Sequence, residues 1–390
     1  MTVKVSKPAI NVREELADLR KPTGIAGEAM LRAETPQEQF NLIGAGRRRI
    51  NQNGDMRIAQ RGTSSTSNGY LVDRYKSYNA TGATYTQSQG TTSPPEGFGH
   101  YLKINTDTAD TSIGSSEYFQ LSHAVEGQDV IGSGWGTSSA IPITLSFWVK
   151  SNVTGTYAVE IQTGLGGYES SHNYTIDASG VWEYKTVTFP AFTATAIPMD
   201  NLAGFILNWW LAAGSTWNTG AISPEWTTGN SGRASGQVNL FAAQNNYWQI
   251  TGVQLELGKV ATPFEHRSYG EELALCQRYY QRYGETGAGN YGPTIGYGTF
   301  NGSPGSTTTE VVSVFQFPVA MRTGPDFAFS DLAHFDLEPF DSTITALATF
   351  SHSSSFFHTV SATTTARETG FVGFICMDTA NGWFEFDAEL

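Results

Sequence analysis

The sequence predicts a mainly β protein with two β domains, and three observations predict it. Aromatic residues (9 Trp, 17 Tyr and 23 Phe) make up 13% of the 390 residues, and they require a packed interior. Glycine is frequent, with 42 residues, whereas charged residues are 15% of the chain, below the usual quarter. Alternating apolar and polar runs recur between stretches rich in Gly, Ser, Thr and Pro. A coiled coil and a highly charged disordered chain are excluded.

The N-terminal segment, residues 1–61, differs from the rest. It holds 11 of the 23 Lys and Arg but 7 of the 36 Asp and Glu, so it is basic and precedes an acidic body. Capping signals at Asn11 and Thr35 predict two short helices, which cannot bury a core of their own. We therefore expect residues 1–50 to attach the protein to a larger partner or to further copies of itself. The apolar residues available for this are Phe40, Leu42 and Ile43.

Five arginines cluster near the end of this segment: Arg47, Arg48, Arg49, Arg57 and Arg61. We expect them to pair with the acidic body or with carboxylates of a partner chain. The net charge of −13 argues against nucleic-acid binding by the main domains. The most apolar run, residues 203–214, is too short for membrane insertion, and the N-terminus shows no secretory signal. The sequence therefore predicts a soluble protein that is made in a cytoplasm.

Residues 62–265 carry the strongest strand signals, and we predict an antiparallel jelly-roll sandwich for them. The predicted strands are short alternating runs that end at turn residues. They are residues 144–150, 157–161, 182–189, 205–211 and 247–257.

At Ser268 the period changes and predicts a bridging helix within residues 266–284. Ser268 and Glu271 form a capping box, and Gly284 is a stop signal about 15 residues later. Apolar residues recur at helical spacing and form a stripe that packs either on a neighbouring sheet or at a subunit junction. The stripe consists of Tyr269, Leu273, Cys276, Tyr280 and Tyr283.

We predict a second β domain for residues 285–390. Asn381-Gly382 is a hairpin signal between the runs 371–378 and 383–390. The last run alternates cleanly, with Phe384 and Phe386 on one face and Trp383 and Glu385 on the other.

No catalytic motif is visible, so we expect no enzymatic activity and no cofactor or metal. Asp107 and Asp110 are less than half of a Ca²⁺ coordination shell. The tryptophans are the one feature of the sequence that points to a binding function, because sugars stack on exposed aromatic planes. The candidates for glycan binding are Trp217, Trp226 and Trp135, which stand among small polar residues. The alternative is that each folds back onto the sandwich or lies at a subunit interface.

Trp148, Trp182 and Trp248 lie in predicted strands, and we assign them to the core.

Several stretches resemble a family of tail-fibre-like virion structural proteins from marine tailed bacteriophages, including cyanophages. The N-terminal stretches are 7–16 and 33–40, and residues 53–62 look like the entry into the family's β domain. Residues 248–257, 261–273 and 276–280 look like its exit and the helix that follows. The resemblance covers most of residues 1–283, and residues 383–390 are similar but weaker. It implies a fold like that of carbohydrate-binding modules and no set of functional residues.

The resemblance implies a phage tail fibre located in the virion. Residues 1–50 would bind other tail or head proteins, the β domains would bind host-surface polysaccharide, and the chain would be a homotrimer. Two alternatives stay open: a structural virion protein without a receptor role (a head fibre, decoration or tail component), and a polysaccharide depolymerase.

Overall fold

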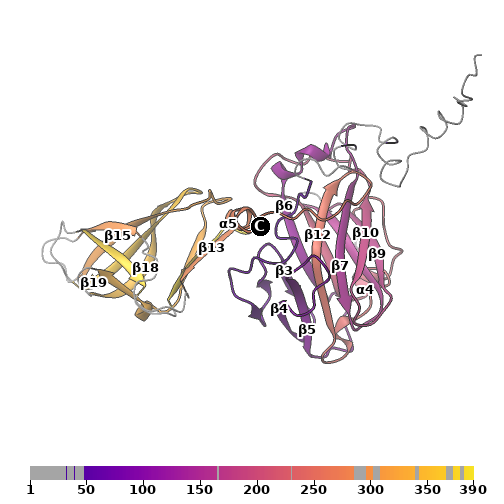
Figure 1. Cartoon of the computed structure of the whole chain (residues 1–390), viewed down its shortest axis with the longest axis horizontal. Helices are drawn as coiled ribbons and strands as arrows, with labels where there is room; N and C mark the ends of the chain where they lie inside the picture. The colour runs from indigo at the N-terminus through magenta and orange to yellow at the C-terminus, as the bar shows by residue number, and fades with distance from the viewer. Residues whose placement is uncertain are drawn as a thin grey trace, which may run out of the picture.

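The computed structural model describes residues 48–164, 167–229, 231–284, 296–301, 308–338, 342–365, 372–377 and 382–390, together with Arg32 and Gln39. The described residues do not include the predicted attachment residues Phe40, Leu42 and Ile43. The two predicted N-terminal helices also fall outside them, apart from the single residues Arg32 and Gln39. The chain forms two β domains that lie end to end, with helix α5 and strand β13 between them (Figure 1).

The first domain is a sandwich of two six-stranded sheets in which every pair of neighbouring strands is antiparallel. The β12 sheet has the order β1 (Ser64–Ser65), β4 (Thr84–Gly90), β5 (Tyr101–Thr108), β12 (Tyr247–Leu257), β7 (Ile143–Ser151) and β10 (Glu183–Phe189). The β11 sheet has the order β2 (Gly69–Tyr70), β3 (Lys76–Asn79), β6 (Tyr118–Glu126), β11 (Ala203–Ala213), β8 (Gly155–Thr163) and β9 (Glu169–Ile176). Short helical turns fill the connections: η1 (Gly127–Asp129), η2 (Ile131–Ser133), α4 (Ser215–Asn218) and η3 (Leu240–Ala242).

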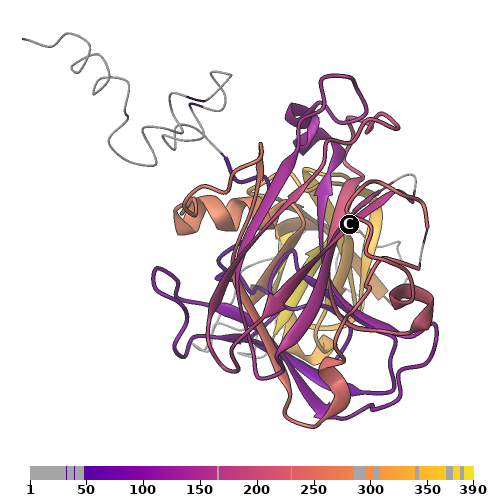
Figure 2. The ribbon, with the colours of Figure 1, turned by 90° about the vertical axis from the view of Figure 1, so that its right-hand side faces the viewer.

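The chain passes repeatedly from one sheet to the other, as in a jelly roll. It crosses between β5 and β6, between β7 and β8, and at both ends of β11. The inner faces meet in one large core in which Phe147, Trp209 and Trp248 are fully buried. All five strands predicted from alternation are present, so the predicted antiparallel sandwich is confirmed. Figure 2 shows the sandwich in front of the second domain.

The bridging helix is shorter than predicted. Helix α5 spans Tyr269–Gln277, with the Ser268 hydroxyl accepting from the Glu271 amide, and the chain then enters strand β13 (Tyr280–Gly284). The predicted stripe on a 15-residue helix is therefore wrong, because pairing of β13 with β21 (Trp383–Asp387) outweighs helical periodicity. Cys276 and Tyr280 are buried within the chain, Leu273 is half-buried and Tyr269 is 58% exposed.

The second domain contains a three-stranded sheet and a closed barrel. The sheet has the order β13, β21 and β16 (Asp326–Phe329), and η4 (Leu332–His334) follows β16. The barrel has the order β14 (Gly296–Asn301), β15 (Thr308–Gln316), β19 (Phe357–Thr365), β18 (Ser342–Ser353), β17 (Phe335–Glu338) and β20 (Val372–Met377).

The alternation predicted for the last strand is confirmed, because Phe384 and Phe386 are fully buried. The predicted hairpin between the last two strands is wrong. β20 pairs with β14 and β17, whereas β21 pairs with β13 and β16. The final strand therefore completes the sheet at the junction rather than the barrel.

Residues 48–61 belong to the sandwich and not to a separate segment. The Ile50 amide donates to the Leu255 carbonyl at 2.9 Å, and Asn51 bonds both the Val253 carbonyl and the Leu255 amide. Met56 lies in the main core. The predicted boundary at residue 61 is thus too late in the chain, since the first described residues already pack on β12.

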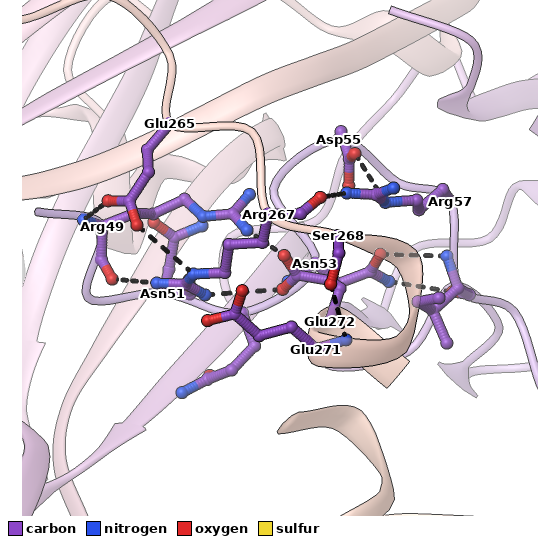
Figure 3. Close-up of polar contacts among 12 residues, drawn as sticks. Arg49, Asn51, Asn53, Asp55, Arg57, Glu265, Arg267, Ser268, Glu271 and Glu272 are labelled. Atoms are coloured by element: carbon purple, nitrogen blue, oxygen red, sulfur yellow. Dashed lines mark hydrogen bonds and ion pairs between the residues drawn. The ribbon is translucent and has the colours of Figure 1, made fainter. Parts of the chain in front are cut away.

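Arg49 and Glu272 form a fully buried ion pair that ties the segment 48–61 to α5 (Figure 3). The same carboxylate accepts from the Asn53 amide at 2.5 Å and lies 3.6 Å from Arg267. The expectation that the arginines pair with the acidic body is confirmed for Arg49, and Arg61 lies 3.0 Å from Asp387.

A second group of charged contacts joins the sandwich to the second domain. Arg74 is fully buried, pairs with Glu389 and lies 3.3 Å from the centre of the Tyr279 ring. The Tyr70 hydroxyl donates to the Leu390 carbonyl at 2.7 Å, which places the C-terminus at the junction (Figure 1).

We predict that Glu272→Gln lowers the free energy of unfolding by about 3–5 kcal/mol, because it leaves Arg49 buried without its counter-charge. Urea denaturation measures this loss. Glu271→Gln, at the exposed neighbouring position, is the control and should change stability by less than about 0.5 kcal/mol. Equal effects of the two substitutions would contradict the role given to Glu272.

Candidate functional site

The three tryptophans proposed from the sequence all fold back onto the sandwich. Trp135 is 5% exposed, its indole N–H donates to the Ile141 carbonyl, and its ring lies 5.1 Å from that of Trp226. The Trp226 N–H donates to the Pro190 carbonyl at 2.9 Å. The packing corresponds to the alternative stated above, in which each tryptophan folds back onto the sandwich, and the buried Trp135 offers no open ring face to a sugar.

Trp217 is half-buried over the outer surface of the β11 sheet. Its ring lies 5.5 Å from Tyr118 and 5.9 Å from Trp210, and the guanidinium of Arg233 lies 5.4 Å from it. Trp217 and Arg233 both belong to the loop 214–236, whose residues bond strand β9 through Glu169 and Ser171. This loop therefore covers the middle of that sheet.

A polar cluster lies beneath the loop. Arg233 donates to both carboxylate oxygens of the buried Glu160, and Asn208 donates to the same carboxylate at 2.9 Å. Glu169, on the neighbouring strand, is buried and one of its oxygens has no hydrogen-bond partner. Burial raises the pKa of Glu169 to about 7; nearby Arg233 lowers it and Glu160 raises it. The cluster holds the loop in place, and its side chains are buried.

The outer surface of the β12 sheet is different, because all of its aromatic residues except the buried Tyr101 are partly exposed. The inward residues Leu145, Phe147 and Val149 alternate with Trp148, which faces outward on β7. We call this surface the aromatic face. Its aromatic residues come from four neighbouring segments: Tyr101, Trp148, Trp182, Tyr184 and Tyr247.

The rings of the aromatic face contact one another across the strands. Trp148 and Tyr184 are register partners with ring centres 5.4 Å apart, and Tyr101 and Trp182 are 5.6 Å apart edge to face. Tyr184 is 45% exposed. The Trp182 N–H donates to the Ser93 carbonyl, which ties the loop 91–100 to the face.

Phe98 of the same loop lies against the sheet at Gly252. Gly252 has φ +62°, and a Cβ there would lie 2.7 Å from the Phe98 ring and 2.9 Å from Trp148. Glycine is thus required both by the backbone conformation and by the approach of Phe98. The register of β12 against β7 shifts between Thr251 and Gln254, next to this point.

Polar groups accompany the rings. Lys103 and Lys150 lie on the two strands that flank β12, each opposite Gln249. The ammonium of Lys150 is 4.9 Å from the Trp182 ring centre, and that of Lys103 is 5.2 Å from Tyr247. A partly open aromatic surface with donors and acceptors at its centre can bind a ligand that has both apolar and hydroxyl faces.

The sequence assignment of Trp148 and Trp182 to the core is wrong, whereas that of Trp248 is confirmed, because Trp248 is fully buried. The sequence did contain a signal for the outward position of Trp148, because the alternation that places Leu145, Phe147 and Val149 inside places Trp148 outside. The contact between Trp182 and Tyr101 comes from strands far apart in the chain and has no local signal.

Among the described residues, no group of three or more His, Cys, Asp or Glu is arranged to hold a metal ion. Asp107 and Asp110 instead accept local hydrogen bonds, from Thr86 and Gly82 respectively. No helix in the described ranges is long and apolar enough to cross a bilayer.

No family model and no curated protein matches the chain. Among solved structures, the chain is similar to the enzymatically active domain of tailspike protein 4 from bacteriophage CBA120, with 11% identity and a TM-score of 0.31. That match covers 53% of this chain but 21% of the tailspike chain.

Two carbohydrate-binding modules match as well. One is a family 4 module, with 12% identity, a TM-score of 0.28, and coverage of 53% of this chain and 97% of the module. The other is a family 11 module from Clostridium thermocellum in complex with a mixed-linked tetrasaccharide, with 12% identity, a TM-score of 0.26 and coverage of 52% and 98%. At these scores the matches identify no function for this chain.

We predict that the raised pKa of Glu169 makes stability fall as pH rises. The folded state holds this proton up to about pH 7, whereas an unfolded Glu releases it near 4.5, so the unfolded state binds fewer protons between the two values. Unfolding free energy should drop by at most about 1.4 kcal/mol per pH unit in that window. Glu169→Gln should flatten this part of the profile, measured by urea denaturation at pH 5, 6, 7 and 8. A profile unchanged by Glu169→Gln would contradict the prediction.

Proposed function

We propose that this chain is a fibre-type virion protein of a tailed phage whose sandwich binds a glycan of the host surface on the aromatic face. The observation that carries the glycan site is the set of partly open rings on the outer surface of the β12 sheet. The sugar ring presents C–H groups that pack on an aromatic plane and hydroxyls that need hydrogen-bond partners.

The two outer surfaces of the sandwich support this choice. The outer surface of the β11 sheet is covered by the loop 214–236, which fills it with Trp217 and Arg233. On the β12 sheet, Trp148, Trp182 and Tyr184 keep part of their surface in solvent. Exposed aromatic residues cost solubility, so a surface that retains several of them is typical of binding.

The virion role rests on the resemblance of the N-terminal and helix α5 stretches to phage fibre proteins. The position of residue 48 is consistent with it, since Arg48 and Arg49 are bonded to Glu265 of the body through their amides, at 2.7 Å each. A mechanical force on the residues before Arg48 would be transmitted to the sandwich through these hydrogen bonds and the Arg49–Glu272 ion pair. Weak glycan sites on repeated fibres would add up through effective concentration.

The homotrimer stays a prediction. The resemblance implies it. The stripe predicted as one place where subunits could meet does not form, because Cys276 and Tyr280 are buried inside the chain. The apolar residues Phe40, Leu42 and Ile43, expected to attach the chain to a partner or to further copies, lie outside the described residues. Light scattering decides between a mass near 42.3 kDa and about three times that value.

We predict that Trp148→Ala and Trp182→Ala each weaken binding to host-surface polysaccharide about tenfold, because each removes a ring that contacts the ligand. Both variants should remain folded, since neither ring belongs to the main core. Trp217→Ala is the matched control: it removes a packed ring on the opposite sheet, so it should lower the melting temperature without changing the affinity of the folded protein. Loss of binding in the control alone would place the site on the β11 sheet.

Truncation tests the attachment role with a sharper boundary than the sequence provides. A chain lacking residues 1–47 keeps Arg49 and Ile50, so we predict a folded β body that no longer enters particles. A chain lacking residues 1–50 loses the Arg49–Glu272 pair and should also be less stable. Normal incorporation of the chain that begins at residue 48 would contradict docking through the N-terminus.

A further inference from the structure

Two lysines lie at the centre of the aromatic face without a carboxylate partner. Lys103 on β5 and Lys150 on β7 stand on either side of Gln249 on β12, and all three side chains point to the outer surface. Within the described part of the chain, neither ammonium lies within 4.0 Å of an Asp or Glu oxygen. Both are half-buried against aromatic rings.

This arrangement is unusual for a protein with a net charge of −13. The carboxylates near these lysines are engaged elsewhere: Asp107 on β5 accepts from Thr86 and Asn105, and Glu183 at the start of β10 pairs with Lys185 at 2.7 Å. Burial lowers the pKa of Lys150, and the positive charge of Lys103 lowers it further. The two charges therefore repel each other, and an anion between them would relieve this repulsion.

Unpartnered polar atoms lie at the same place. Gln249 is 6% exposed and Thr251 is fully buried, yet the Gln249 amide oxygen and the Thr251 hydroxyl have no hydrogen-bond partner. Both residues alternate with the inward Trp248 and Ile250, so they belong to the outer surface. Gln249 thus lies between the two lysines on the central strand of the sheet, and it gives neither ammonium a negative charge to pair with.

Building on the proposed glycan binding, we infer that the aromatic face takes an acidic polysaccharide, with a carboxylate or sulfate group placed between Lys103 and Lys150. The partly exposed rings of Trp148, Trp182 and Tyr184 would contact the sugar planes. The lysines would thus favour negatively charged polysaccharides over neutral ones. The rings would contribute affinity for both kinds of polysaccharide.

Paired polysaccharides with one backbone test this inference. The full-length protein is titrated with polygalacturonate and its methyl-esterified form, and with dextran sulfate and dextran, at 50 mM and 300 mM NaCl. We expect at least about tenfold tighter binding to the charged member of one pair, and loss of that preference at high salt. Preference within the first pair identifies a carboxylate ligand and preference within the second a sulfate ligand.

Variants separate charge from fold. Lys103→Gln with Lys150→Gln should remove the preference for the charged member, so that the charged and the neutral member of a pair bind with equal affinity. Lys76→Gln, an exposed lysine on the opposite sheet, is the control and should keep the preference. Should the double variant unfold, the salt dependence of the unmodified protein still provides the test.

The outcomes distinguish the two proposals. Equal binding to charged and neutral members, or a preference retained by the double variant, overturns the acidic-ligand inference and leaves glycan binding intact. Binding to neither member of either pair, by a folded protein, counts against glycan binding itself.

Discussion

The buried carboxylate of Glu272 fixes how the segments that enter and leave the sandwich are arranged. It is fully excluded from solvent and contacts Arg49, Arg267 and the Asn53 amide, so it joins the segment 48–61, the segment after β12 and helix α5 at one point (Figure 3). A buried ion pair adds little net stability against a well-packed apolar alternative, but it tolerates only one geometry. We infer that its role is to set where residue 48 leaves the body and where α5 begins.

Helix α5, which Glu272 holds in place, also connects the sandwich to the second domain. The helix leads directly into β13, whose partner β21 carries the chain's last residues back to the sandwich. There Glu389 meets Arg74 and Arg61, and Arg278 holds Glu126 from the other side of the junction. The barrel is thus connected through the first and last strands of its domain, both of which belong to the junction sheet. Such a connection resists rotation better than a single linker would.

The sandwich assigns different roles to its two outer surfaces. One is sealed by the loop 214–236, whose Arg233 neutralises the buried Glu160. The other keeps its rings and two lysines partly in solvent. Because the first surface stabilises the fold, its tryptophans cannot be read as ligand contacts, even though they lie in a loop among polar residues. Loop position alone is a poor guide to exposure when the loop is long enough to fold over a sheet.

The sequence by itself determined the class of fold, the five long strands of the sandwich and the buried face of the last strand, because these depend on alternation within one segment. It also indicated that the N-terminal arginines serve the acidic body. Only the tertiary structure decided the length of α5, since pairing with a strand about 100 residues later outweighs its helical periodicity. The same holds for the candidate site: Trp182 meets Tyr101, and Lys103 faces Lys150, because β12 brings distant strands together. The side chains of a sheet surface are collected across strands, and no local pattern records which strands will be neighbours.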